Sequence, residues 1–187
     1  MKLGRSFYSR KTDLVAKDLL GCILVHKFDG KKLSGRIVET EAYFGENDPG
    51  SHASRGMTPR NRIMFGKPGF AYVYFVYGNH YCLNFTTEPE GKAGAVLIRA
   101  LEPLEGIEEM KRRRGREDNL TNGPGRLTQA LGITKEHNGL DLTGNGIYVL
   151  RGRKPEEIVR TTRIGLSNGK NLLLRFYIRG NKFVSVI

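Results

Sequence analysis

The sequence predicts an α+β fold, in which residues 1–187 form a single domain with a curved, mostly antiparallel β-sheet flanked by short helices. With 187 residues, of which 39% are hydrophobic, the chain can bury one core without disulfides or metals. β-type runs outnumber helical ones, and tight Gly-containing turns such as Asp29-Gly30 join neighbouring runs, which is typical of antiparallel hairpins. No internal repeat or linker divides the chain.

The first elements are a short helix and a hairpin. The helix is predicted over residues 12–20, because Asp13 can cap its start and Gly21 can close its end. Strands are predicted over 22–28 and 33–43, on either side of the Asp29-Gly30 turn.

A long polar loop separates this hairpin from the next strands. Residues 44–70 are rich in Gly, Pro, Asn and Arg, and loops of that length are usually functional or disordered. The runs 71–77 and 81–87 are predicted to form a second hairpin about Gly78-Asn79. Residues 94–101 are almost continuously apolar, which predicts a central strand.

The second half of the chain adds two helices and a tail. A helix is predicted over 103–114, with Pro103 near its start and cations at its end. Residues 121–133 are expected to form a glycine-rich turn that leads into a short helix. The tail is predicted to be a hairpin that turns at Gly180-Asn181.

Charge and targeting features narrow the class of protein. The 31 Lys and Arg outnumber the 19 Asp and Glu, so the net charge is +12, which favours polyanionic partners such as nucleic acid.

Cys22 and Cys82 lie far apart and have no metal-ligand spacing, which indicates a reducing compartment. The N-terminus has no apolar signal core, and the run 19–25 is too short to cross a bilayer. We therefore expect a cytoplasmic protein with no membrane partner; since nothing indicates oligomerisation, we expect a monomer.

The strand RIVETEAYF places Glu39, Glu41 and Tyr43 on one face, because successive side chains of a strand alternate. One interpretation is that this face meets water, as one face of an antiparallel sheet often does. The other is that a carboxylate lies in a cleft and takes part in chemistry.

Two Gly- and Arg-containing segments could contact phosphates. The guanidinium groups of Arg55, Arg60 and Arg62 match phosphate oxygens. The NGPGR stretch at 122–126, which includes Gly125 and Arg126, offers free backbone amides ahead of a helix. The alternatives are a solvated basic loop and an ordinary helix N-terminus. The run KRRRGR at 111–116 is interpreted as a helix end facing water.

Aromatic residues and a histidine could form a site near the second hairpin. Four tyrosines, Tyr72, Tyr74, Tyr77 and Tyr81, either pack the sheet or stack on bases. Only Tyr77 adjoins the tip, where an exposed ring could insert into a base stack. His52 could bind a metal, but no metal-binding spacing supports this.

The chain resembles the alkyladenine (3-methyladenine) DNA glycosylase family in order from about residue 3 to the C-terminus. The segments that carry the resemblance are RIVETEAYFG, SHASRGMTPRNRIMF, AYVYFVYGNHYCLN, VLIRALEPLEG, LTNGPGRL and LRFYIRG. It implies a monofunctional base-excision repair enzyme that flips damaged purines out of duplex DNA. Such an enzyme hydrolyses the N-glycosidic bond and leaves an abasic site without a metal or other cofactor.

The resemblance also implies catalytic and base-binding roles for individual residues. Glu41 matches the glutamate that activates water, and Arg99 matches the arginine that positions the water and the acid. Tyr43, His52 and Tyr74 match the residues that enclose the flipped base.

Further matches concern the choice of lesion and the gap that the flipped base leaves in the stack. Tyr77 matches the tyrosine that fills the gap in the stack, and Asn84 matches the asparagine that crowds the exocyclic amine of guanine. Asn79 and Leu83 stand where relatives are expected to carry methionine, so the detailed lesion preference is open.

Two other functions remain open from the residues alone. One is a non-catalytic nucleic-acid-binding module of basic loops and tyrosines. The other is a metal-dependent nuclease that uses Glu39, Glu41, Asp48 and His52.

Overall fold

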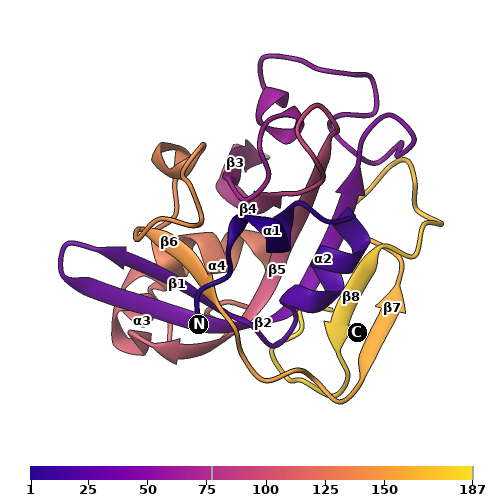
Figure 1. Cartoon of the computed structure of the whole chain (residues 1–187). Helices are drawn as coiled ribbons and strands as arrows, with labels where there is room; N and C mark the ends of the chain where they lie inside the picture. The colour runs from indigo at the N-terminus through magenta and orange to yellow at the C-terminus, as the bar shows by residue number, and fades with distance from the viewer. Residues whose placement is uncertain (77, 187) are drawn as a thin grey trace.

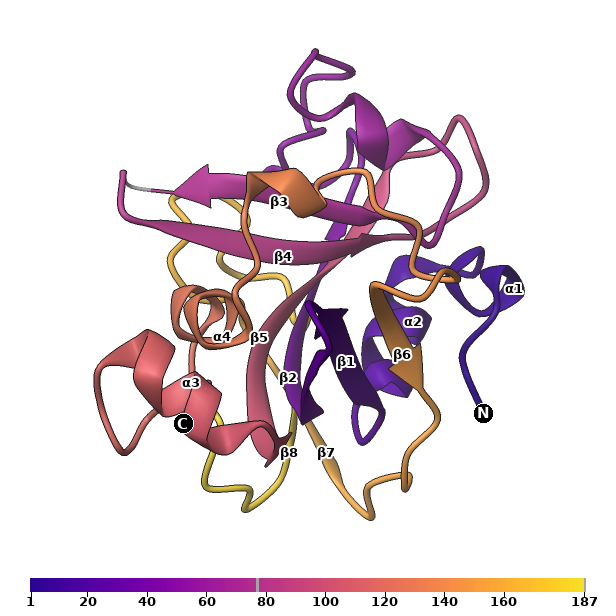
Figure 2. The ribbon, with the colours of Figure 1, turned by 90° about the vertical axis from the view of Figure 1, so that its left-hand side faces the viewer.

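The computed structural model describes residues 1–76 and 78–186, and within them the chain is organised around one curled antiparallel sheet. The strands are β1 (Ile23–Phe28), β2 (Lys31–Phe44), β3 (Ala71–Val76), β4 (His80–Thr86), β5 (Gly94–Glu105), β6 (Ile147–Leu150), β7 (Ile158–Thr161) and β8 (Arg175–Ile178). The order β3-β4-β5-β2-β1-β6 is completed by β8, which pairs with β2 and β7. Figure 2 shows the β3–β4 hairpin running across the long strands β2 and β5, and this arrangement confirms the predicted fold class.

Short helices cover the sheet (Figure 1). They are α1 (Arg5–Tyr8), α2 (Thr12–Leu19), the 3₁₀ helix η1 (Arg62–Phe65), α3 (Ile107–Arg114), α4 (Pro124–Leu131) and the 3₁₀ helix η2 (Lys135–His137). Helix α2 packs on β2 and β5, where the Thr40 hydroxyl donates to the Ala16 carbonyl at 2.9 Å, and α4 packs on β4 and β5. No helix of the described residues is long and apolar enough to cross a bilayer.

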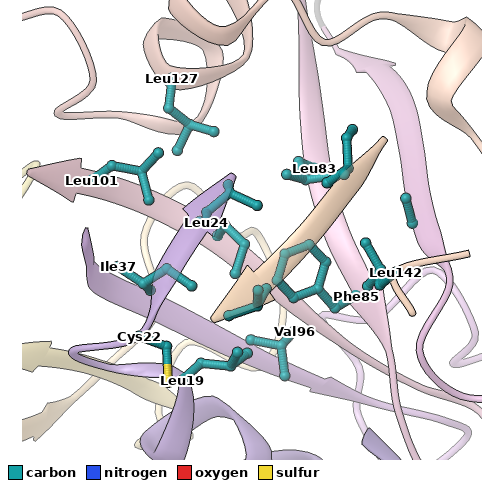
Figure 3. Close-up of a cluster of buried hydrophobic side chains, with 14 of the residues drawn as sticks. Leu19, Cys22, Leu24, Ile37, Leu83, Phe85, Val96, Leu101, Leu127 and Leu142 are labelled. Carbon is teal, nitrogen blue, oxygen red and sulfur yellow. The ribbon is translucent and has the colours of Figure 1, made fainter. Parts of the chain in front are cut away.

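The core lies between these helices and the sheet. Figure 3 shows Leu19 of α2 and Leu127 of α4 reaching the same cluster as Leu83 and Phe85 of β4. All four side chains are fully buried. Because Leu83 is a core residue, it does not lie at the hairpin tip.

The second predicted helix begins later than its sequence indicated. Pro103 belongs to β5, opposite Gly35, and α3 begins only at Ile107, so the prediction of a helix from residue 103 was wrong. A register shift between Ser34 and Gly35 accommodates the proline, which has no N–H to donate. Gly106 ends the strand in the left-handed conformation (φ 75°).

The prediction of a hairpin within the C-terminal tail was also wrong. Strand β8 pairs with β7 and with Glu39–Glu41 of β2, and no strand follows the turn at Gly180 among the described residues. Instead, the Ser185 N–H donates to Glu39 Oε2 at 2.7 Å. The β-type pattern of the tail correctly marks a strand, but it cannot identify that strand's partner.

Burial of His26 predicts a specific loss of stability in acid. Its Nδ1–H donates to the Leu131 carbonyl at 2.8 Å, and burial, which outweighs this bond, lowers the His26 pKa to about 4. The unfolded chain therefore takes up a proton below about pH 6.5, while the folded chain stays neutral, so the free energy of unfolding falls as pH drops. We expect this group alone to cost about 2–3 kcal/mol between pH 7 and 4.5. Urea unfolding of His26→Gln should show a correspondingly smaller loss; an unchanged pH dependence would contradict this origin.

Candidate active site

Four side chains form a row across the sheet. The strand registers pair Tyr72 with Asn84, Asn84 with Leu97 and Leu97 with Glu41, from β3 through β4 and β5 to β2. Paired residues of neighbouring strands project from the same face. Glu41 therefore lies at one end of a row whose other members line a cavity.

This cavity has a volume of about 530 Å³, within the size range of small-molecule pockets. Seven of the residues singled out from the sequence line it: Tyr43, His52, Arg60, Tyr72, Tyr74, Asn84 and Arg99. They come from β2, the 44–70 loop, β3, β4 and β5. The curl of the sheet thus brings together residues that lie far apart in the sequence.

Glu41 is fully buried, and three donors converge on its carboxylate. The Ile164 N–H donates to Oε1 at 2.8 Å, the Tyr43 hydroxyl donates to Oε2 at 2.7 Å, and Arg99 Nη1 lies 3.3 Å from Oε1. A buried carboxylate requires partners of this kind. The interpretation that this face of the strand simply meets water is therefore wrong.

Arg99, which contacts both glutamates, occupies a β-bulge. The register changes from Glu39 opposite Ala100 to Thr40 opposite Ile98, so Arg99 is the extra residue on β5. Its Nε lies 3.3 Å from Glu39 Oε1. Burial acts to lower the pKa of Arg99, but the charges of Glu41 and Glu39 outweigh it and raise the pKa. The guanidinium is thus fixed as a cation between two carboxylates.

Glu39 is just as buried, but its oxygens have different partners. Arg175 Nε donates to Oε1 at 2.7 Å, and the Ser185 N–H and hydroxyl donate to Oε2 and Oε1 at 2.7 and 3.0 Å. These contacts connect Glu39 to β8 and to the C-terminal segment. Both oxygens of Glu41 accept hydrogen bonds from residues that line the cavity, Ile164 and Tyr43. Glu39 meets the cavity lining through its ion pair with Arg99.

Neutral rings form a wall of the cavity. The His52 ring lies 4.6 Å from that of Tyr74, and its Nδ1 lies 3.0 Å from the Tyr72 hydroxyl. Burial, and then the charge of Arg60, lower the pKa of His52; burial raises the pKa of Tyr72 to about 12, against the effect of Arg60. The imidazole and the phenol therefore stay uncharged at neutral pH.

Asn84 is fixed in the cavity by the backbone. Its side-chain NH₂ donates to the Tyr72 carbonyl at 3.1 Å, and the residue is 3% exposed. This bond fixes the orientation of the amide, so the group presents a constant shape to any ligand.

A buried ion pair behind the cavity was missed by the sequence analysis. Both Asp48 oxygens accept from Arg163, Oδ2 from Nη1 and Oδ1 from Nη2, each at 2.6 Å. The two residues are 115 positions apart, and neither the sequence pattern nor the spacing links them. Asp48 had been considered only as a metal ligand.

These contacts do not fit a metal site. The carboxylates of Glu39 and Asp48 are already engaged by arginine and by N–H donors. Within residues 1–76 and 78–186, no group of three or more His, Cys, Asp or Glu side chains is arranged to hold a metal ion. The nuclease alternative therefore lacks the ligand set that it requires.

The basic residues divide into two groups. In the run 111–116, Lys111, Arg112, Arg113 and Arg116 form ion pairs with neighbouring acids. Arg55, Arg60 and Arg62 are exposed and form no ion pair with a described residue; Arg60 lies 5.4 Å above the Tyr74 ring. The loop that carries them borders the cavity.

The start of α4 reaches the same cavity. Pro124 lines it, and Arg126 Nη1 donates to Asn122 Oδ1 at 3.0 Å. Gly125 packs so closely on His80 that an added Cβ would lie 2.5 Å from the ring. Tyr77, the expected intercalating residue, lies outside the described residues.

Comparison with known proteins identifies relatives over the whole chain. Residues 6–182 match the family model described as methylpurine-DNA glycosylase. A curated protein from Carboxydothermus hydrogenoformans is 55% identical over 190 residues, covering 99% of each chain. Proteins from Chlorobium phaeobacteroides and Methanoculleus marisnigri are each 50% identical and cover 98% and 99% of this chain, and 95% and 99% of their own lengths. All three carry the name "Putative 3-methyladenine DNA glycosylase".

Proposed function

Because this chain belongs to the methylpurine-DNA glycosylase family, we propose that it extrudes damaged purines from duplex DNA and hydrolyses their N-glycosidic bond with water activated by Glu41. The chain is a DNA-repair enzyme of the DNA glycosylase class. The proposed lesions are alkylated or deaminated purines of the 3-methyladenine, 7-methylguanine and hypoxanthine class. The observation that carries the proposal is the buried carboxylate of Glu41 beside a cavity with aromatic walls.

Glu41 can supply the chemistry that this reaction needs. Departure of the base leaves oxocarbenium-like charge on the sugar, as in glycoside hydrolysis. A carboxylate stabilises that charge and accepts a proton from the attacking water. Arg99 and the Ile164 N–H hold Oε1, and the Tyr43 hydroxyl holds Oε2, so the group is oriented before substrate arrives. The product is an abasic site.

The cavity suits a flipped purine. Tyr43, Tyr74 and His52 offer faces and edges for stacking, and a cationic alkylated purine gains about 0.5–2 kcal/mol from each aromatic face. Asn84, fixed by its bond to the Tyr72 carbonyl, would crowd the exocyclic amine of guanine and so select against the normal base.

The basic segments around the cavity are proposed to hold the DNA backbone. The groups proposed for phosphate contact are the side chains of Arg55, Arg60, Arg62 and Arg126 and the backbone of Gly125. The enzyme is proposed to act as a cytoplasmic monomer on damaged double-stranded DNA.

Tyr77 is proposed to fill the gap that the extruded base leaves. Tyr77→Ser should therefore slow base release from duplex DNA about tenfold or more, and slow release from single strands much less, because only the duplex has a stack to refill. Single-turnover rates on matched single- and double-stranded substrates measure the difference. Equal losses on the two substrates would contradict this role.

Base release tests the proposed function directly. Duplexes containing hypoxanthine or 7-methylguanine are incubated with the protein and a metal chelator, and free base and strand breaks are measured. We expect free base without nicks. Nicked strands without free base would instead support the nuclease, and salt-sensitive binding without any product would support the binding module.

A further inference from the structure

Arg163 connects three separate parts of the chain behind the cavity. Its side chain is fully buried, and Nη1 donates to the Ala42 carbonyl at 2.9 Å as well as to Asp48. Asp48 in turn accepts from the N–H groups of Phe44 and Gly50 at 3.0 and 3.1 Å. The pair therefore holds the end of β2, the turn after it, and the segment that follows β7 in one arrangement.

Two of the three donors to the Glu41 carboxylate adjoin this pair. Ile164, which donates to Oε1, is the next residue after Arg163. Tyr43, which donates to Oε2, has the Arg163 guanidinium carbon 4.5 Å from its ring centroid. Both the N–H and the hydroxyl are thus held by one side chain that does not itself touch Glu41.

The position of the Arg163 guanidinium influences which purines the cavity can bind. Tyr43 lines the cavity and Arg163 does not, so the guanidinium lies behind the ring as seen from the ligand. A cation behind an aromatic ring weakens the attraction of that ring for a cation in front of it. Asp48 accepts two hydrogen bonds from Arg163, and its negative charge offsets the guanidinium charge behind the ring.

We propose that Arg163, held in place by Asp48, is a positioning residue that presents the Tyr43 hydroxyl and the Ile164 N–H to Glu41. The neutrality of the Arg163–Asp48 pair also lets Tyr43 attract cationic purines. This inference rests on the proposed function. It identifies the residues that hold the donors of the catalytic carboxylate and that influence which lesions the enzyme prefers. Arginine is required because only its planar fork can reach both Asp48 oxygens, the Ala42 carbonyl and the ring face.

The first test is Arg163→Lys, which keeps the charge and removes the fork. Single-turnover base release should fall about tenfold or more on both hypoxanthine and 7-methylguanine, because small misplacements of catalytic groups are costly. Affinity for duplex DNA should change less than about threefold. The matched control is Arg5→Lys, which alters another Arg–Asp pair, with Asp141, away from the cavity (N–O 2.5 Å), and should leave the rate unchanged.

All rates are compared at a temperature where circular dichroism shows each variant fully folded. An Arg163→Lys rate equal to that of Arg5→Lys would overturn the positioning role.

The second test is Asp48→Asn, which leaves Arg163 uncompensated. Release of 7-methylguanine, a cationic base, should fall about tenfold more than release of neutral hypoxanthine. A merely structural loss would slow both lesions equally, and that result would overturn the charge part of the inference.

A crystal structure of Arg163→Lys decides the positioning role without an activity measurement. The Ile164 N–H or the Tyr43 hydroxyl should move out of hydrogen-bonding distance of Glu41. Retention of both bonds would overturn the inference. A wild-type protein that releases no base would contradict the proposed function, whereas this structural result would still decide the positioning role.

Discussion

Glu41→Gln is expected to reduce base release about 10³-fold or more while duplex DNA still binds. Glutamine has nearly the same shape, but it can neither accept the proton from water nor offset positive charge on the sugar. Its NH₂ group would also face a donor, either the Ile164 N–H or the Tyr43 hydroxyl, where the carboxylate presents two acceptors. The measurement is the single-turnover rate on a hypoxanthine duplex, together with the dissociation constant of the same duplex.

Glu39→Gln is the matched control, since Glu39 lies two residues away in the same strand and is equally buried. Its hydrogen bonds are with Arg175 and Ser185, and it meets the cavity lining through its ion pair with Arg99. We expect it to lower stability and to leave the rate of the folded protein within about tenfold of wild type. Full activity in Glu41→Gln, or a larger catalytic loss in Glu39→Gln, would reverse the roles of the two glutamates.

Arg99→Met is expected to lower the free energy of unfolding by about 3–5 kcal/mol, because it leaves two buried carboxylates without their shared cation. Methionine fills much of the same space, so the loss reports charge rather than a cavity. Urea unfolding at neutral pH measures this loss of unfolding free energy.

The control is Arg36→Met on the same strand as Glu39, since Arg36 lies half-exposed and 3.5 Å from Glu102. Removal of that surface ion pair should cost less than about 1 kcal/mol. A similar small loss in Arg99→Met would show that the buried carboxylates do not depend on Arg99.

Local patterns in the sequence were sufficient to predict most of the elements. Alternation correctly placed Glu39, Glu41 and Tyr43 on one face, and glycine turns correctly marked two of the three predicted hairpins. Alternation could not distinguish the two glutamates, because their difference arises from partners on β8 and in the C-terminal segment. Only the family resemblance indicated Glu41.

Long-range contacts account for what the sequence did not predict. The bulge at Arg99 depends on the pairing of β5 with β2, and no residue type marks it. Asp48 and Arg163 meet across 115 residues, and a carboxylate in a polar loop is compatible with many partners. The sequence predicts a helix start near Pro103 because proline favours that position. In the structure Pro103 instead belongs to strand β5, which pairs with β2.

A crystal structure of Glu41→Gln bound to a duplex containing hypoxanthine tests most directly whether Glu41 acts on an extruded purine nucleotide. The lesion should lie outside the stack, with its base between Tyr43, Tyr74 and His52 and its sugar carbon C1′ beside residue 41, one water molecule away. An intact, stacked lesion, or a base bound elsewhere with residue 41 remote from the sugar, would contradict the proposed mechanism.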